Sequence, residues 1–364
     1  MLKKVLAAAL SLLLVLAVAL PGVAEFAPVA KESLKVGFIY IGDVVDKGYT
    51  YAHHQGTLAM KEALGLTDDQ VIIKTNIPED SACEAAVREL VDAGCQIIFG
   101  NSFGYMDIFE EMSQEYPNVI FSHCSGYKSN DVNYNNYFGA IYQARYLTGI
   151  AAGLKTKTNK IGYVAAFSLP EVDGGCNAFA LGVQSVNPDA VVYIKYNNSW
   201  YDPTLERQTA EALLDAGCDV IAQHCDTAMP QLAAQERGVW GVGYNSDMSV
   251  DAPDAVLTAP VWNWGAVVTF EVKEVIEGTW KPENIFMDMA DGLVDIAPLT
   301  KNVADGTAEA IETAKAKIMA REFDVFEGPI YDNAGELRVK EGEKLDRAYI
   351  AGSIDWLVKG VEVK

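Results

Sequence analysis

The chain has 364 residues, of which 50% are hydrophobic and 21% charged, and its formal net charge at pH 7 is -22. These values are typical of a folded protein long enough for two domains and exclude a disordered chain. The acidic balance argues against nucleic acid and anionic membrane as partners, because both are bound through basic surfaces.

Residues 1–24 have the pattern of a secretory signal peptide. Lys3 and Lys4 precede an apolar run over residues 7–20, which is shorter than the ~20 residues of a membrane-spanning helix. We predict cleavage after Ala24, with Ala30 as an alternative site and an uncleaved anchor as a second possibility. The signal peptide therefore predicts an exported protein that is periplasmic or at the cell surface. No cysteine lies near the junction, so we expect no lipid anchor there.

Strand and helix patterns alternate from Lys35 onwards. Apolar runs predict strands at residues 36–41, 71–77, 96–101 and 119–122, with helices beginning at residue 49 and over 81–94, 105–116 and 138–155. A second series predicts strands at 161–166, 191–196, 220–223 and 239–244, with helices near 176–186, 204–216 and 228–237. This alternation is typical of βαβ units with parallel sheets.

The two series contain the same local pattern. Residues 90–98 read LVDAGCQII and residues 213–221 read LLDAGCDVI, and in both a helix ends at glycine just before a buried strand. We therefore predict an α/β fold of two Rossmann-like lobes with similar topology.

Further elements are predicted after the second series. They are strands at 256–261 and 285–289, helices at 266–277 and 307–322, a hairpin turn at 333–335 and an amphipathic piece at 354–358. We assign residues 35–150 and about 256–285 to an N-terminal lobe, residues 151–255 and about 290–325 to a C-terminal lobe, and residues 326–364 to a tail packed on the lobes. Repeated crossing between the lobes predicts a multi-stranded hinge beside a cleft.

Aromatic and polar side chains follow the predicted strands at their carboxyl ends, where open α/β sheets bind ligands. This composition suits a planar ligand held between rings, with carboxylate, amide and imidazole groups at its edges. Surface packing of the rings, helix caps at Asp202 and Asp226, and a turn at Asp247 are the structural alternatives. The predicted ligand-binding residues are Tyr49, Tyr51, Ser102, Phe103, His123, Phe167, Trp200, Asp226, Asp247, Asn263 and Trp264.

Motifs for phosphate binding and for zinc-dependent hydrolysis are absent from the sequence. It contains no GxxxxGK[ST] or HExxH motif, and we expect neither an enzyme nor a cofactor. Histidine and cysteine adjoin at residues 123–124 and 224–225, but neighbouring strand residues point to opposite faces, which argues against a metal site. The six cysteines are scattered, and we interpret them as free, buried side chains.

Several segments resemble the basic-membrane-protein family, the substrate-binding proteins of ABC transporters with the type I periplasmic-binding-protein fold. They are KVGFIYIGDVVDKGYTYAHHQG from Lys35, NSFGYMD from Asn101, IGYVAAF from Ile161, NSWYDP from Asn198 and GYNSDMS from Gly243. The resemblance implies a purine base or purine nucleoside as ligand and a membrane permease as partner. We expect the protein to act as a monomer.

Two positions depart from the family pattern. The resemblance implies an acidic residue where Asn245 stands and a lysine near Trp262, both facing the ribose of a nucleoside. Their absence favours a free base similar to adenine, hypoxanthine or guanine. We therefore predict an extracytoplasmic substrate-binding protein of an ABC importer for a purine base. The alternatives are a purine nucleoside binder, a sugar receptor of the same fold and an exported hydrolase acting on nucleosides.

Overall fold

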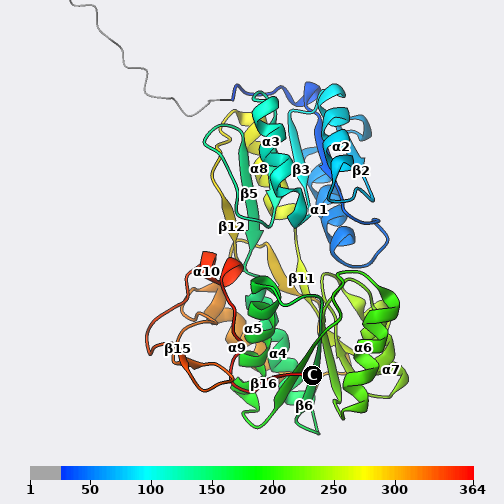
Figure 1. Ribbon diagram of the computed structural model, residues 1–364, viewed down its shortest axis with the longest axis vertical. Helices are drawn as coiled ribbons and strands as arrows, with labels where there is room; N and C mark the ends of the chain where they lie inside the picture. Colours follow the sequence, from blue (N-terminus) through cyan, green and yellow to red (C-terminus); the bar gives the residue numbers. More distant parts are fainter. Residues whose placement is uncertain (1–25) are drawn as a thin grey trace, which may run out of the picture.

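The computed structural model describes residues 26–364, so the predicted signal peptide lies outside the described residues. Two lobes lie one above the other along the long axis of the molecule, joined at a narrow waist (Figure 1). Each lobe contains a six-stranded sheet, and the two-lobed α/β fold predicted from the sequence is confirmed.

The N-terminal lobe has a parallel sheet in the order β12-β5-β4-β3-β1-β2. Its strands are β1 (Val36–Ile39), β2 (Val71–Lys74), β3 (Ile97–Gly100), β4 (Ile120–Cys124), β5 (Tyr134–Gly139) and β12 (Ile285–Met287). Helices α1 (Tyr49–Leu64) and α8 (Gly265–Glu277) pack with one apolar cluster, and α2 (Ser81–Asp92) and α3 (Met106–Glu115) pack with another. The sheet is therefore covered on both faces, which explains its continuous apolar strands.

The C-terminal lobe repeats this plan with the order β10-β9-β8-β6-β7-β16, again all parallel. Its strands are β6 (Lys160–Ala165), β7 (Val191–Tyr196), β8 (Val220–His224), β9 (Trp240–Val242), β10 (Val256–Thr258) and β16 (Val361–Val363). Its helices are α4 (Ile141–Lys155), α5 (Pro170–Val186), α6 (Pro203–Asp215), α7 (Met229–Glu236), α9 (Thr307–Met319) and α10 (Arg347–Gly352).

The repeated sequence pattern forms the same turn in both lobes. Gly94 follows α2 with φ of 87°, and Gly217 follows α6 with φ of 93°, a left-handed conformation that favours glycine. The amide of Cys95 donates to Leu90 O at 3.0 Å, and the amide of Cys218 donates to Leu213 O at 3.2 Å. Each turn feeds a central strand, β3 or β8, so the two lobes are built alike.

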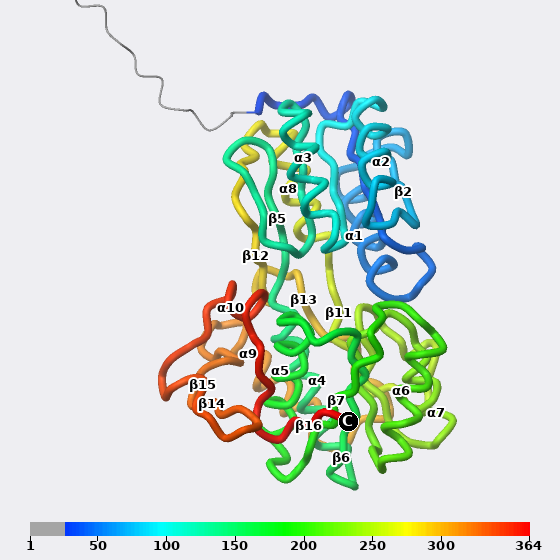
Figure 2. Tube along the Cα trace, in the orientation of Figure 1, coloured from blue at the N-terminus to red at the C-terminus, as the bar shows by residue number. Residues whose placement is uncertain are grey.

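Three segments cross the waist (Figure 2). They are the junction of β5 with α4, the strand β11 (Pro260–Trp262), and the segment from β12 to β13 (Val294–Ile296), which pairs with β11 in an antiparallel ribbon. The crossings meet at Gly139, where an added Cβ would lie 2.4 Å from Leu293 Cδ2 and 3.1 Å from Trp262 Cζ3. This close packing leaves no room for a side chain at position 139 of the hinge.

The tail packs on the C-terminal lobe and reaches the hinge. It forms a hairpin of β14 (Ile330–Tyr331) and β15 (Leu337–Val339), then α10, and finally β16 beside β7. Buried Asn177 on α5 holds this tail, because its amide donates to Trp356 O and accepts from the Val358 amide, both at 2.8 Å. At the start of α10, Arg347 donates to Asp288 at 2.8 Å, just beyond β12.

The structure differs from the predicted elements at several places. Strand β5 was not predicted, and residues 256–261 form two short strands, with β10 in the second sheet. The residues predicted as an amphipathic piece, 354–358, lie between α10 and β16 in neither a helix nor a strand. All six cysteines are free and buried, as predicted. Among residues 26–364, no helix combines the length and apolar character needed to cross a bilayer.

Candidate functional site

A cavity of about 450 Å³ lies between the two lobes, within the range of about 300–1,000 Å³ of ligand pockets. Its walls come from the segments that follow the carboxyl ends of parallel strands in both sheets, the place where open α/β sheets bind ligands. From the N-terminal lobe it is lined by Ile41, Gly42, Asp43, Asp46, Tyr49, Thr50, Asn76, Glu79, Asn101, Ser102, Phe103 and Ser125. From the C-terminal lobe it is lined by Glu171, Trp200, Tyr201, His224, Asp226 and Tyr244.

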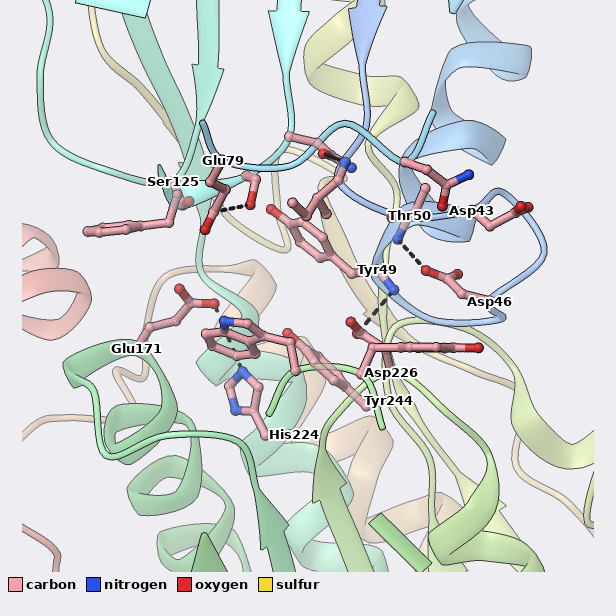
Figure 3. Close-up of a pocket in the computed structure, with 18 residues that line it drawn as sticks. Asp43, Asp46, Tyr49, Thr50, Glu79, Ser125, Glu171, His224, Asp226 and Tyr244 are labelled. Atoms are coloured by element: carbon pink, nitrogen blue, oxygen red, sulfur yellow. Dashed lines mark hydrogen bonds and ion pairs between the residues drawn. The ribbon is translucent and has the colours of Figure 1, made fainter. Parts of the chain in front are cut away.

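The lobes touch each other at one end of this cleft (Figure 3). The amide of Tyr49, at the start of α1, donates to Asp226 Oδ1 at 3.2 Å across the gap, and Asn245 Nδ2 donates to the same oxygen at 2.8 Å. The Ser246 hydroxyl also donates to Lys47 O. These contacts hold the loop between β1 and α1 against the loops that follow β8 and β9, so the cleft is closed on this side.

Aromatic rings line both sides of the cleft. Tyr49 and Phe103 come from the N-terminal lobe, and Trp200, Tyr201 and Tyr244 from the C-terminal lobe. Phe103 is 54% exposed and Trp200 39%, so each ring keeps a free face that a ligand could cover. Such faces suit a flat ring, because aromatic systems attract each other in offset or edge-to-face arrangements.

The Tyr244 ring is held from behind. Trp262 Nε1 donates to the Tyr244 hydroxyl at 3.3 Å, and the buried guanidinium of Arg145 lies 3.9 Å from the centroid of the Tyr244 ring. Contacts of this kind fix a ring in one orientation. Tyr244 therefore offers a rigid surface at the base of the cleft.

The charged side chains that line the cleft all carry carboxylates. They are Asp43, Asp46, Glu79, Glu171 and Asp226, and no lysine or arginine of the described residues joins them. Burial raises the pKa of Asp226 well above its usual value, with the charges of Asp46 and Glu206 adding to the effect. Burial likewise raises the pKa of Asp46. A site of this polarity attracts groups that donate N–H or O–H hydrogen bonds and disfavours anions.

Two buried polar atoms at the cleft have no hydrogen-bond partner in the described part of the chain. Asn101 accepts from the Ile41 amide at 2.9 Å through Oδ1, which leaves its Nδ2 as an unused donor. His224 is equally unpaired at Nε2. Because unpaired buried polar groups are costly, a ligand that satisfies them gains affinity.

The structure brings five of the predicted ligand-binding residues to the cleft, namely Tyr49, Ser102, Phe103, Trp200 and Asp226. Ser102 donates its hydroxyl to Glu79 at 2.6 Å, and Asp226 makes the contacts between the lobes described above. Asp226 does not serve as a helix cap, since α7 begins after Ala228. The alternative of a cap holds for Asp202, which accepts from the amides of Thr204 and Leu205.

The other six predicted residues do not line the cleft. Trp264 is fully buried and stacks on Trp262 at 4.2 Å between ring centroids, and buried His123 contacts the Ser102 carbonyl at 2.7 Å through Nε2. Burial lowers the pKa of His123 to about 4. Phe167 packs against Trp200 at 5.5 Å between ring centroids, and Tyr51 lies beneath the Lys47 ammonium. Asp247 is exposed and caps the short helix η4 (Met248–Val250), and Asn263 donates to Gly292 O.

Several residues that line the cleft were not among the predicted ligand-binding residues. Asn76 and Glu79 follow β2, Asn101 follows β3, Ser125 follows β4, and Tyr244 follows β9. The rule that led to the other positions, to search beyond the carboxyl ends of parallel strands, applies to all of them. Glu171 was missed for another reason, because α5 begins at Pro170 and not at residue 176 as predicted.

Known proteins resemble this chain over most of its length. The family model described as Bmp, ABC transporter substrate-binding protein PnrA-like, matches residues 33–327. A purine-binding protein of Brucella abortus (strain 2308) is 40% identical over 335 residues, which cover 92% of this chain and 95% of that protein. A Haloferax volcanii protein provisionally named as an ABC transporter glucose-binding protein is 33% identical over 309 residues, which cover 85% of this chain and 78% of that protein.

Solved structures agree with the fold. An ABC transporter solute-binding protein from Aeropyrum pernix K1 superposes with a TM-score of 0.70 at 19% identity, covering 80% of this chain and 92% of that chain. The cleft lies between the lobes of this same fold, at the carboxyl ends of both sheets. The chain belongs to the Bmp family of PnrA-like ABC transporter substrate-binding proteins.

Proposed function

We propose that this protein is the exported receptor of an ABC importer and that it binds a purine base in the cleft between its lobes. The observation that carries the proposal is the combination of aromatic rings from both lobes with carboxylates and one free amide donor, and with no lysine or arginine among the residues of 26–364 that line the cleft. A purine ring stacks on aromatic side chains and presents both N–H donors and ring-nitrogen acceptors at its edge. The name of the Brucella abortus relative supports the same ligand class.

A free base is favoured over a nucleoside. Neither Asn245 nor Trp262, the two positions that depart from the pattern of nucleoside-binding members, lines the cleft. Asn245 Nδ2 donates to Asp226, and Trp262 stacks on Trp264 while its Nε1 donates to the Tyr244 hydroxyl, so both side chains contact protein groups and lie outside the lining. A nucleoside therefore gains fewer hydrogen bonds to its ribose here than in a member that carries an acidic residue and a lysine at these two positions.

A sugar is the second candidate ligand, and the name of the Haloferax volcanii relative favours it. Sugars also stack on tryptophan and tyrosine and donate hydroxyl groups to carboxylates. The two opposed sets of rings fit a thin heteroaromatic ring better than a sugar. Such a ring also offers an acceptor within its own plane to the unpaired Asn101 donor.

A thermal-shift series with matched ligands tests the proposal. Adenine, hypoxanthine and guanine are compared with adenosine, inosine and glucose, each confirmed by titration calorimetry. A ligand at 100 times its Kd stabilises the folded protein by about 2.7 kcal/mol. We expect this stabilisation from at least one base and a weaker effect from nucleosides and glucose. Stabilisation by glucose alone would overturn the proposal, and release of a base from inosine would identify a hydrolase.

The remaining parts of the proposal concern partners. In an importer of this kind the receptor delivers its ligand to a membrane permease, and it works outside the cytoplasm. We propose that it does so as a monomer, which light scattering of the purified protein tests directly. A mass of twice the chain would contradict the monomer without bearing on the ligand.

A further inference from the structure

Two side chains at the base of the cleft face each other without forming a hydrogen bond. Glu171 lies in the first turn of α5, and His224 lies at the end of β8. The distance between Glu171 Oε1 and His224 Nε2 is 3.9 Å, which is too long for a hydrogen bond (Figure 3). The Glu171 side chain is 25% exposed, whereas that of His224 is 1% exposed. Glu171 therefore reaches into the cavity, and His224 forms part of its floor.

The neighbours of His224 fix its ring. The Tyr163 hydroxyl lies 3.3 Å from Nδ1, and a hydroxyl that donates to Nδ1 leaves the ring proton on Nε2, the unpaired atom. On α5, one turn beyond Glu171, an added Cβ at Gly175 would lie 3.2 Å from His224 Nδ1 and 3.3 Å from Arg145 Nε. This tight packing sets the position of Glu171 relative to the imidazole.

We infer that Glu171 and His224 together bind one edge of the ligand ring, with the Glu171 carboxylate accepting a ligand N–H and His224 Nε2–H donating to the adjacent ring nitrogen or carbonyl. This assignment rests on the proposed function and adds the two residues that select the ligand edge. An acceptor next to a donor matches the alternating groups along the edge of a purine base. A sugar hydroxyl both donates and accepts, so it gains less from a fixed pair of this kind.

The charge of Glu171 is set by its surroundings. Burial raises its pKa to about 7, and the guanidinium of Arg145 acts in the opposite direction. The other titratable groups near Glu171 are His224 on β8, Tyr244 after β9, Tyr49 on α1, Cys124 on β4 and Tyr142 on α4, and the cleft also holds Asp226 of the same lobe and Asp46 of the opposite lobe. Burial lowers the pKa of His224 well below its usual value and raises the pKa of Tyr244, Tyr49, Cys124 and Tyr142. Near neutral pH the imidazole, phenol and thiol groups are therefore uncharged, whereas Glu171 changes its charge; burial raises the pKa of Asp46 and Asp226 as well.

A dependence of affinity on pH follows. The ionised carboxylate accepts the ligand N–H much more strongly than the protonated acid, so ligand binding favours loss of the Glu171 proton when the pH lies below about 7. The Kd for a neutral base should then rise about tenfold for each pH unit below 7, until the pKa of Glu171 in the complex is reached. Above this pH the affinity should be constant.

Titration calorimetry with adenine and hypoxanthine at about pH 8, 7, 6 and 5.5 tests the inference. For the base that binds more tightly, we expect the Kd of wild type to be constant above pH 7 and to rise about tenfold for each pH unit below it. Glu171→Gln keeps the shape of the side chain and should weaken binding about 10-fold to 100-fold at pH 8, with a flat profile below it. Glu271→Gln is the matched control, because burial raises the pKa of Glu271 to about 7 as well, yet its carboxylate accepts from Ser122, Asn135 and Trp280 away from the cleft.

The outcomes are distinct. A flat wild-type profile overturns the inference whether or not any variant folds. A Glu171→Gln profile that still falls below pH 7 overturns it too, and assigns the titration to another group such as Asp226. A loss of the profile in both Glu171→Gln and Glu271→Gln would show a general effect on the fold and not a ligand contact. If wild type binds no purine base at pH 8, the proposed function itself fails.

Discussion

The contact between Gly48 and Asp226 allows a direct test of closure between the lobes. An added Cβ at Gly48 would lie 2.4 Å from the Asp226 backbone oxygen, 2.5 Å from its Cβ and 2.6 Å from its Cα. Ordinary contacts between non-bonded carbon atoms are about 3.5–4.0 Å, so the two loops would have to separate by about 1 Å. None of the three atoms is the end of a flexible side chain. Gly48→Ala should therefore hinder closure.

The cost of this change falls on the closed state. Inserting a methyl group into a packed contact costs about 1–3 kcal/mol, and the amide of Tyr49 would move away from Asp226. If ligand binding requires the closed state, its Kd should rise by about 5-fold to 150-fold. Titration calorimetry with the best purine base measures the affinity, and small-angle scattering measures the separation of the lobes with and without it. We expect the variant to remain more extended than wild type at equal saturation.

The control for this variant is Gly352→Ala. An added Cβ at Gly352 meets no atom of residues 26–364 within 4 Å, so the affinity and scattering curve of this variant should match wild type. Wild-type affinity in Gly48→Ala would refute the reasoning, because it would mean that the loop before α1 does not close on Asp226 when ligand binds.

Three further predictions concern single side chains. Trp200→Ala should weaken base binding by about 1–3 kcal/mol through lost stacking, while Phe270→Ala, which removes a comparably exposed ring on α8, should leave calorimetric affinity unchanged. Asn101→Ala should also weaken binding, by about 5-fold to 10-fold, because the ligand loses a neutral N–H donor; an unchanged Kd would place the ligand elsewhere in the cleft. Burial raises the pKa of Glu271 from 4.5 to about 7, so its contribution to the free energy of unfolding is present below pH 4.5 and is lost as the pH rises to about 7. The free energy of unfolding, measured with urea, should therefore fall less between pH 4.5 and about 7 in Glu271→Gln than in wild type. Parallel plots of this free energy against pH for the two proteins would contradict the assignment.

Much of the fold follows from sequence periodicity because most strands here are continuous apolar runs in parallel sheets. Strand β5 was missed because its sequence, YNNYFG, contains two asparagines and reads as a loop. In the structure Asn135 is fully buried, and its Nδ2 donates to Glu271 Oε2 at 3.0 Å. A partner distant in sequence makes this polar residue acceptable in a central strand, and no local pattern reveals such a partner.

The candidate site was predicted only in part, again because sequence position alone does not reveal contacts between distant segments. Position beyond a strand correctly places Tyr49, Phe103 and Trp200 at the cleft, because the carboxyl ends of all parallel strands in a lobe meet at one edge. It does not tell which way a side chain turns. Trp264 turns into the core, where it stacks on His53 at 4.2 Å between centroids, since the close approach of α1 and α8 buries that face. Glu171 enters the cleft because Pro170 starts α5 earlier than the apolar pattern indicates.

The mass of the small molecule that the protein retains tests the central claim most directly. The protein is purified under native conditions without added ligand, denatured, and the released molecule is identified by mass spectrometry. We predict the mass of a purine base held between the rings of the two lobes, in about one copy per chain. The mass of a hexose or of an intact nucleoside in that amount would contradict the account.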